Sequence, residues 1–497
     1  MIKIERLRTS MTLTSIALNN YSRRFMLSAA SAVALLLGLP TSETLAAPEN
    51  SKEFNIRSFG ATGDGTTLDT EGIQKAIDAC AAADGGQVLI PSGNYVTGTL
   101  RMKDHVTLHL GKGATLLGST NLADYATDIV GSIEAPAFNR CLIYAHSAKK
   151  IAFTGSGWID ARGSKTHFPE KVGNGLGERP MLMRLIACQD VAFQDLNFKN
   201  SASWGLHLVD CDRVRFNGIR IESQNNNVNN DGIDLDGCQD VEIIKCRINA
   251  GDDAICPKST TERLCKNIVV RDCVLSSHTA GFKLGTSSRG GFVNIEVTNT
   301  RFVDCPMGAI KLLLVDGGRM ENVLLSDLKM ERVGGPIFVR LGNRGRAYNQ
   351  PTEQIYDGDQ KPEGVPTGII RNIHIKNIDA TITGDQRDRQ GIMMTGIPGH
   401  RIEDVALENI RISFPGGGTE PEAKRIVPED IARYPEQFFF GVLPSSFLYA
   451  RHIKGLSLKN ITVTFEKTDA RPPVHLENVE KLTHSRVIFD QRPWKPK

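Results

Sequence analysis

Short runs of alternating apolar and variable residues recur through the middle and the end of the chain. Each run opens on an apolar residue, here called its anchor, and from Val191 to Val323 successive anchors lie 23, 27, 27, 27 and 28 residues apart. Alternation with a period of two is typical of β-strands. The complete series of anchors is Ile151, Val191, Val214, Val241, Ile268, Ile295, Val323, Ile373, Val405, Leu456 and Leu482. The pattern predicts a repeat built from short strands.

The length of the repeat predicts the fold. A period of 23 to 28 residues, with two or three short strands in each unit and no helical pattern, is typical of a β-solenoid. One coil cannot bury its own inner face, so neighbouring coils must stack and share a core. Leucine-rich repeats have a similar length, but their fixed spacing of Leu and Asn is missing. We therefore expect an all-β protein, a single-stranded right-handed parallel β-helix of about ten coils.

Further segments are expected at the ends of the solenoid. A helical stretch at Thr70–Ala83 lies in the N-terminal part, residues 53–120, and is placed to cap the first coil, whose open edge must be blocked. Two late steps of 50 and 51 residues leave room for loops at Gly342–Pro366 and Gly416–Leu443. The solenoid domain is expected to occupy residues 48–497.

Ten cysteines raise the question of a disulfide framework. Six of them instead share two positions of the repeat, Cys188, Cys211, Cys238 and Cys265 in one and Cys246 and Cys273 in the other. Such positions are small, buried and apolar, which suits free thiols. We expect mostly free, structural thiols. The chain has no Cys-x-x-Cys, so a zinc site is not expected.

The first 47 residues have the layout of an export signal. The pair Arg23 and Arg24 precedes the apolar run Ser28–Leu39, which is too short to span a membrane stably, and small residues follow it. Paired arginines before a Phe resemble the twin-arginine type of signal. An ordinary Sec signal and an uncleaved anchor are the alternatives. We expect a periplasmic or secreted protein.

Composition and charge narrow the range of partners. With 23% charged and 40% hydrophobic residues the chain is globular rather than disordered, collagen-like or coiled-coil. The formal charge is +3, and removal of residues 1–46 takes away five basic and two acidic residues, which leaves a net charge of zero. Nothing here favours nucleic acid or a membrane surface. We expect a monomer without a membrane span in the mature protein.

Three aspartates carry the candidate chemistry. Asp231 follows its anchor by 17 residues, whereas Asp252 and Asp253, one coil later, follow theirs by 11 and 12. One coil advances the chain by ~4.8 Å, so these carboxylates come near each other, but the unequal offsets do not stack them unless a turn differs in length. Carboxylates that lie close together repel one another, so the pKa of at least one of them is raised. That carboxyl can then keep its proton and act as a general acid beside an ionised general base.

Three nearby aspartates receive a structural interpretation. Asp and Asn are common in solenoid turns, where they form ladders. The residues concerned are Asp234, Asp236 and Asp240.

Four motifs resemble those of family 28 glycoside hydrolases, the polygalacturonases and rhamnogalacturonases of pectin breakdown. They are Asn229-Asn230-Asp231-Gly232-Ile233-Asp234, Gly251-Asp252-Asp253, Phe59-Gly60-Ala61-Thr62-Gly63-Asp64-Gly65 and Asn200-Ser201-Ala202-Ser203-Trp204. The resemblance runs from about residue 53 to the end, with the specific motifs between 200 and 315. The resemblance implies an inverting enzyme. Asp252 would be its general acid, and Asp231 together with Asp253 would hold and deprotonate the attacking water. In such enzymes the acid and the base lie ~6.5–9.5 Å apart.

Two family motifs are altered. Ala280 replaces the histidine of Gly-His-Gly, although His278 lies two residues earlier, and Ala309 replaces the arginine of Arg-Ile-Lys, of which Lys311 remains. In pectinases that Arg–Lys pair meets a uronate carboxylate, so the resemblance leaves galacturonate at the cleavage site open. Lys258 and Lys283 are further cations near the site, with a solvated outer face as the alternative. The expected substrate-binding residues are Asn229, Lys258, His278, Lys283 and Lys311.

Three functions compete. The first is an exported, inverting glycosidase that cleaves a pectin-like polysaccharide or oligosaccharide without a metal or cofactor. The second is a polysaccharide lyase or epimerase of the same architecture, which usually needs Ca²⁺ or a Lys or Arg base. The third is a catalytically inactive carbohydrate-binding solenoid, which the lost histidine and arginine favour and the three intact aspartates oppose. The sequence does not name the sugar, the linkage or endo versus exo action.

Overall fold

The computed structural model describes residues 52–169, 178–223, 227–346, 365–383 and 391–496. The chain divides into two units, Met1–Ala46 and Ala47–Lys497. The predicted export signal, residues 1–47, lies outside the described residues and stays a prediction. Everything below concerns the second unit.

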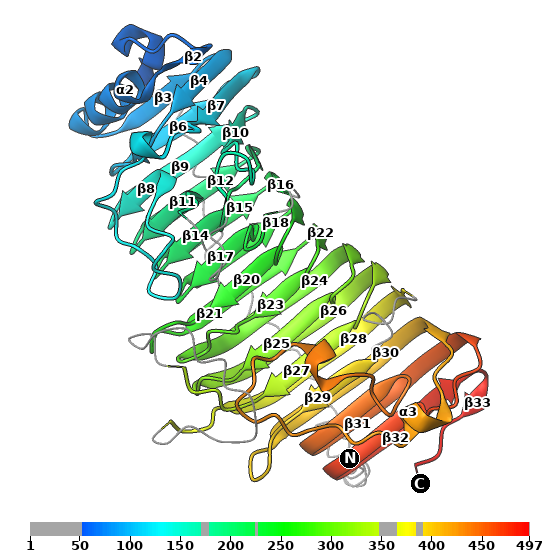
Figure 1. The fold of residues 1–497 in the computed structure, drawn as a ribbon. Coiled ribbons are helices and arrows are strands. Elements are labelled where there is room, and N and C mark those ends of the chain that lie inside the picture. Colours follow the sequence, from blue (N-terminus) through cyan, green and yellow to red (C-terminus); the bar gives the residue numbers. More distant parts are fainter. Residues whose placement is uncertain (1–51, 170–177, 224–226, 347–364, 384–390, 497) are drawn as a thin grey trace, which may run out of the picture. The chain divides into compact units, whose positions relative to one another are not determined.

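The second unit is a parallel β-helix, whose chain winds repeatedly through three rows of parallel strands (Figure 1). In the first row, each strand pairs with the next one in this order: β1 (Glu53–Asn55), β3 (Gly86–Ile90), β6 (Val106–Leu110), β9 (Lys149–Gly155), β12 (Gln189–Gln194), β15 (Asp212–Asn217), β18 (Gln239–Ile244), β21 (Cys265–Arg271), β24 (Gly291–Cys305), β26 (Arg319–Val333), β28 (Ile369–Ile382), β30 (Ile402–Gly416), β31 (Leu448–Lys467) and β32 (Val474–Phe489).

The second row lies beside the first and merges with it towards the C-terminus. It consists of β2 (Asp64–Leu68), β4 (Gly93–Thr97), β7 (Ala114–Gly118), β10 (Trp158–Asp160), β13 (Asn197–Lys199), β16 (Arg220–Ser223), β19 (Arg247–Ala250) and β22 (Val274–Ser277). From β24 onward one long strand serves both rows, since β22 pairs with the second half of β24.

The third row carries the chemistry described below. It consists of β5 (Leu100–Arg101), β8 (Cys141–His146), β11 (Met181–Ile186), β14 (Leu206–Val209), β17 (Ile233–Asp236), β20 (Ile255–Lys258), β23 (Phe282–Leu284), β25 (Ile310–Leu314), β27 (Ile337–Leu341) and β29 (Ile392–Thr395), and it ends on the first residues of β31 and β32. A last short strand, β33 (Arg492–Pro493), pairs antiparallel with β32.

The predicted register is confirmed. The eleven anchors, from Ile151 to Leu482, form ten successive pairs across neighbouring coils of the first row. The anchors are apolar because they point into the shared core, where all of them except the last one are buried. The row extends before Ile151 by β1, β3 and β6, which the repeat in the sequence does not mark.

Helix α2 (Thr70–Ala82) confirms the predicted helix at the N-terminal end (Figure 1). Its apolar face, Ile73, Ala76, Ile77 and Cys80, is buried in the same core as the strands. The helix therefore covers the open end of the core, as expected for a cap. A short 3-10 helix, η1 (Ile56–Phe59), precedes it.

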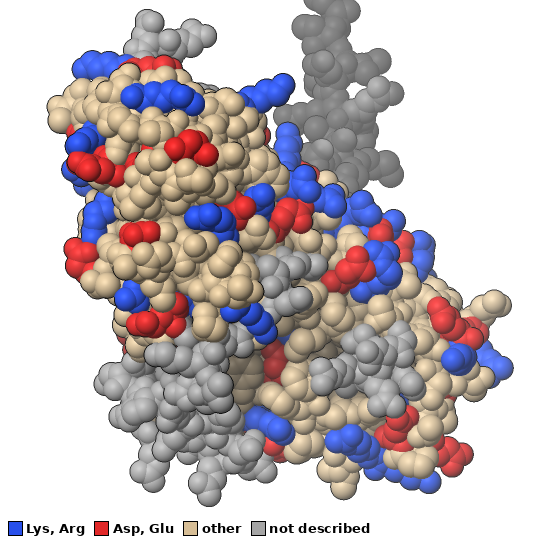
Figure 2. Space-filling view, turned by 45° about the horizontal axis from the view of Figure 1, so that its top comes forward, with Lys and Arg blue, Asp and Glu red and all other residues tan. Residues whose placement is uncertain are grey.

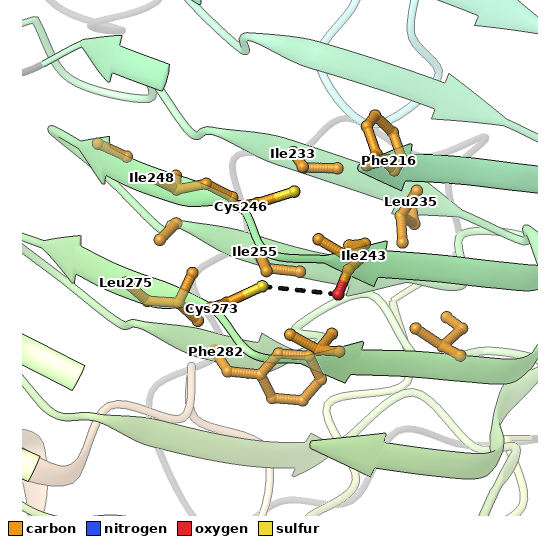
Figure 3. Close-up of a cluster of buried hydrophobic side chains, with 14 of the residues drawn as sticks. Phe216, Ile233, Leu235, Ile243, Cys246, Ile248, Ile255, Cys273, Leu275 and Phe282 are labelled. Carbon is orange, nitrogen blue, oxygen red and sulfur yellow. Dashed lines mark hydrogen bonds between the residues drawn. The ribbon is translucent and has the colours of Figure 1, made fainter. Parts of the chain in front are cut away.

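The cysteines are free and buried, which confirms the prediction. Cys246 and Cys273 point into the core beside Ile248 and Leu275, and the Sγ of Cys273 lies 3.5 Å from the carbonyl oxygen of Ile243 (Figure 3). The thiols thus fill small ladder positions.

An amide ladder runs along the start of the first-row strands, where each coil turns in from its third-row strand. The side chain of Asn267 donates to Asp240, and the ladder continues through Asn294, Asn322 and Asn372, each of which has a positive φ. Asn and Asp tolerate this left-handed conformation better than most residues. The structural interpretation of Asp240 is confirmed, since it belongs to this ladder at the start of β18, whereas Asp234 and Asp236 lie on strand β17 and outside the ladder.

Two connections pack on the outside of the third row. Residues 119–140, which contain η2 (Leu122–Asp124), place Ile129 and Phe138 against Tyr144 and Trp204. The second connection is residues 417–447, which contain α3 (Glu420–Ala423) and η3 (Gln437–Phe440). It covers all but the first residue of the predicted loop Gly416–Leu443 and extends four residues beyond it. It places apolar side chains against β25, β27 and β29. Most of the other predicted loop, Gly342–Pro366, lies outside the described residues.

Basic and acidic side chains are interspersed over the face in Figure 2, without a broad patch of one sign. No helix among the described residues is both long and apolar enough to cross a membrane.

Candidate active site

The three predicted aspartates lie where two coils of the third row begin. Ile233 of β17 pairs with Ile255 of β20, so Asp231 and Asp253, each two residues earlier, stack at equivalent positions. One carboxylate oxygen of each lies within 4.8 Å of the other. The unequal offsets in the sequence are cancelled because the connection from β16 to β17 is longer than the one from β19 to β20.

Asp252 is held by hydrogen bonds at the edge of this stack. Its Oδ2 accepts the backbone N–H of Asn229 (3.1 Å), and its Oδ1 accepts the backbone N–H of Asp253 (2.9 Å). The hydroxyl of Thr279 lies 2.9 Å from Oδ1 of Asp252 and 2.6 Å from Oδ1 of Asp253. One hydroxyl therefore links both carboxylates, and their Oδ1 atoms lie closer together than the ~6.5–9.5 Å expected between acid and base. Asp252 is half-buried, whereas Asp231 and Asp253 are buried, so Asp252 is the most accessible of the three.

Two of the predicted lysines are buried against these carboxylates. Lys283 Nζ lies 2.8 Å from Oδ2 of Asp253. Lys258 Nζ lies 3.1 Å from Oδ1 of Asp234 and 4.0 Å from Oδ2 of Asp231, and it sits 3.8 Å from the centre of the Trp204 ring. The alternative interpretation of both lysines as solvated surface residues is wrong, since their side chains are 7% exposed.

The other predicted binding residues have different surroundings. Lys311 is buried and lies 2.5 Å from Oε2 of Glu436, which comes from the connection 417–447. The side chain of Asn229 accepts a hydrogen bond from Arg179 (3.2 Å), so its role among the described contacts is to hold the turn before Asp231. His278 is exposed, next to Thr279 in the turn between β22 and β23.

Sequence reasoning missed the residues that the connections contribute. Glu134, from residues 119–140, lies 3.6 Å from Nζ of Lys258 and accepts a hydrogen bond from Ser287 (2.7 Å). Glu436 comes from residues 417–447. Neither connection follows the repeat, so no positional pattern marks these carboxylates. Thr279 occupies the same position of the repeat as Asp252, one coil later, so the repeat could have identified it as a neighbour of Asp252.

The three aspartates differ in pKa because their electrostatic surroundings differ. Burial, together with the charges of Asp234 and Asp252, raises the pKa of Asp231 well above its usual range. Burial and the charge of Asp253 also raise the pKa of Asp252. Burial acts in the same direction on Asp253, but the cations Lys283 and Lys311 outweigh it, and the pKa of Asp253 is lowered. One carboxylate is thus held ionised while its two neighbours favour the proton.

Among the described residues, one group of side chains could supply ligands to a metal ion. Oxygens of Asp231 and Asp253 and the Sγ of Cys256 lie within 4.8 Å of one another. However, Lys283 already neutralises Asp253, and burial raises the pKa of the Cys256 thiol well above its usual range. The thiol lies 3.1 Å from the carbonyl oxygen of Gly285, as a donor. These contacts suit a protonated thiol better than a metal ligand.

Comparison with known proteins agrees with this geometry. Residues 80–429 match the family described as Glycosyl hydrolases family 28. A probable polygalacturonase from Vitis vinifera is 25% identical over 381 residues, which cover 72% of this chain and 74% of the relative. An exo-poly-alpha-D-galacturonosidase from Dickeya chrysanthemi is 30% identical over 263 residues, and this match covers 43% of each chain.

Solved structures show the same fold. The exopolygalacturonase from Thermotoga maritima superposes with a TM-score of 0.63 at 24% identity, covering 74% of this chain and 88% of the other. The family 28 exopolygalacturonase from Yersinia enterocolitica gives 0.62 at 20% identity, covering 86% and 78%. Both resemble this chain in fold. Since the family match spans most of the chain, the protein belongs to family 28 of the glycosyl hydrolases and is a glycosidase.

Proposed function

We propose that this protein hydrolyses O-glycosidic bonds in a pectin-like polysaccharide or its oligosaccharides by a single displacement that inverts the anomeric carbon. The observation that carries the proposal is the cluster of Asp231, Asp252 and Asp253, in which one carboxylate is held ionised by a lysine and two favour the proton. Paired carboxyl groups in different protonation states are what glycoside hydrolysis requires.

Asp252 is assigned the role of general acid. Its pKa is raised by burial and by Asp253, and it is more accessible than the other two aspartates, so it can reach the glycosidic oxygen. In the reaction its proton passes to that oxygen as the bond to the anomeric carbon breaks. Its hydrogen bonds to Asn229 and Thr279 fix the direction in which the carboxyl points.

Asp253 and Asp231 are assigned to the attacking water. Asp253, held ionised by Lys283, accepts a proton from the water as its oxygen bonds to the opposite side of the anomeric carbon. Within the described part of the chain, Oδ1 of Asp231 makes no hydrogen bond to protein, so it can accept one from this water. Inversion follows because no enzyme atom bonds to the sugar.

The surroundings of the lysines argue against a lyase or epimerase. An elimination base must be able to lose its own proton before it can take one from the sugar. Although burial opposes it, the carboxylates of Asp234 and Glu134 raise the pKa of Lys258 well above its usual range, and Asp253 does the same for Lys283. Both lysines therefore remain charged and suit electrostatic support rather than proton abstraction.

Substrate and location are proposed from the relatives and the first residues of the chain. The names of the Vitis and Dickeya relatives specify polygalacturonide bonds, which supports a pectin-like substrate. The pattern around Arg23 and Arg24 supports export to the periplasm or beyond.

The test combines product analysis with stereochemistry. Purified protein is incubated with pectic polysaccharides and oligosaccharides, new reducing ends are quantified, and the first-formed anomer is identified by proton NMR before mutarotation. Hydrolysis with inverted configuration is expected. Retention would contradict the assigned mechanism, and an unsaturated product absorbing in the ultraviolet would indicate a lyase instead.

A further inference from the structure

Each buried lysine near the three aspartates faces a carboxylate of the protein. Lys283 is paired with Asp253, Lys258 lies between Asp234 and Glu134, and Lys311 is paired with Glu436. The pair of Lys311 with Glu436 is the shortest at 2.5 Å, with side chains 1% and 8% exposed. The protein itself therefore supplies the anionic partner of each buried lysine.

The buried arginines around the site are engaged as well. Arg344 donates two hydrogen bonds to Asp316, at 2.9 and 2.6 Å. Arg184 donates to the carbonyl oxygens of Val130 and Gly131, at 2.7 and 2.8 Å, and so holds the connection 119–140. On the other side, Arg340 donates to the carbonyl oxygens of Glu429 and Asp430, at 2.7 and 2.8 Å, and holds the connection 417–447. These guanidinium groups serve the fold of the site.

The buried lysines leave no cation over for a further carboxylate. After each lysine has been matched with one carboxylate, Glu134, Asp231 and Asp252 remain. Glu134 lies 4.0 Å from Arg346. Burial and neighbouring carboxylates raise the pKa of Asp231 and of Asp252, which reflects this lack of cations. A further carboxylate brought by a substrate would meet repulsion in surroundings where charges are poorly screened.

Lys311 lies two coils further along the solenoid than Asp252 and Asp253. It pairs with Lys283 across β23 and β25, and Lys283 contacts Asp253. Lys311 is also one of the two cations that lower the pKa of Asp253. A substrate that extends from the reacting unit in this direction lies towards Lys311 and Glu436. To form an ion pair there, its carboxylate would have to displace Glu436 and leave that buried charge unpaired, which is costly.

We propose that the sugar unit seated over Lys311 carries no carboxylate, and that Glu436 is the residue that determines this preference. The carboxylate of Glu436 occupies the place of a uronate carboxylate, so the site accepts a neutral sugar of the pectin-like chain. This inference rests on the proposed function.

The test compares matched substrates. Pectic oligosaccharides are divided, and in one half the carboxyl groups are chemically reduced to primary alcohols, which leaves linkage and chain length unchanged. We expect kcat/KM to be at least about tenfold higher for the reduced half, because like charges brought together in a binding site cost several kcal/mol. Equal or faster cleavage of the uronate half would overturn the inference and leave the proposed function intact. Cleavage of neither half would contradict the proposed function itself.

Two variants examine the role of Glu436. Glu436→Gln removes the competing charge, so the ratio of kcat/KM for uronate over reduced substrate should rise by about tenfold or more. Glu420→Gln, an exposed change on the same connection, should leave this ratio unchanged. An unchanged ratio in Glu436→Gln, with a thermal melt like that of the wild type, would contradict the assignment. The wild-type comparison holds even if the variant does not fold.

Discussion

Nζ of Lys283 lies 2.8 Å from Oδ2 of Asp253, and both side chains are buried. The contact decides which of the aspartates is ionised, because the cation outweighs the burial that would otherwise keep the proton on Asp253. It also joins two coils, since the lysine comes from β23 and the aspartate from the turn before β20. Which aspartate is ionised therefore depends on the stacking of these two neighbouring coils.

Lys283→Met should move the acidic limb of the pH–rate profile to higher pH. Without the cation the pKa of Asp253 rises, so the ionised base forms only at higher pH. The variant should also lose about 3–5 kcal/mol of stability at neutral pH, because a buried carboxylate is left unpaired, and it should regain part of this as the pH falls and Asp253 is protonated. Kinetics and thermal melts across the pH range measure both effects.

The matched control is Lys329→Met, which removes an exposed lysine that lies 3.1 Å from Glu331. Exposed ion pairs contribute about 0–1 kcal/mol, so its melt and its pH profile should resemble those of the wild type. Identical pH profiles for Lys283→Met and the wild type would show that Lys283 does not set the protonation of Asp253.

The fold could be predicted from the sequence because the core imposes a repeat. Positions such as Val214 and Val241 must be apolar in every coil, so their spacing shows which residues stack. The stacking of Asp231 on Asp253 could not be derived in this way, since it depends on two turns of different length. The anchors show where the strands of the first row lie, but they do not show at which residue the chain comes back into register with the neighbouring coil after a longer turn.

The residues that enclose the site were beyond prediction for a different reason. Glu134 and Glu436 reach it from connections that pack on the outside of the third row and follow no periodicity. Lys258 and Lys283 were identified as cations near the site, but their burial could not be predicted, because outward-facing positions of a solenoid are normally solvated. The two connections cover this row, and strands such as β17 and β25 are buried on both faces.

Arg23→Lys combined with Arg24→Lys should block export. A twin-arginine signal requires both arginines, and lysine keeps the charge while removing the guanidinium. Unprocessed precursor should accumulate in the cytoplasm, as measured by fractionation and immunoblotting. The single change Lys3→Arg in the same segment is the control, and normal export of the double variant would indicate an ordinary Sec signal.

The ten thiols should be unreactive in the folded protein. All ten cysteines are free and buried, and burial raises the pKa of several of them, including Cys141 to about 12, so little thiolate is present for reaction. A thiol reagent should modify the protein only after denaturation, with mass spectrometry counting the adducts. A gel mobility that changes with reductant would instead reveal disulfides.

Asp236→Asn should flatten the dependence of stability on pH. Burial raises the pKa of Asp236 from 3.8 to about 6, although Thr260 donates hydrogen bonds to it. Because the pKa is higher in the folded chain, the contribution of this carboxyl is present at low pH and is lost as the pH rises through about 6, a change of about 3 kcal/mol. Melting temperatures measured at several pH values should fall less for Asp236→Asn than for the wild type or for the exposed variant Asp379→Asn. Parallel curves would contradict the raised pKa.

Asp252→Asn should lower kcat on natural sugars by about 10²–10⁴, the usual contribution of a positioned general acid. The amide has nearly the same volume and keeps an acceptor for the N–H of Asn229, so folding should survive. Nitrophenyl glycosides, whose leaving group needs little protonation, should lose much less activity. Asp231→Asn and Asp253→Asn should slow both substrates alike, because water must be activated in either case. Asp240→Asn, in the turn ladder, controls for the loss of a carboxylate elsewhere in the solenoid. If Asp252→Asn retains the activity of the wild type on natural sugars, Asp252 is not the acid, and a second carboxyl such as Asp231 must protonate the leaving group.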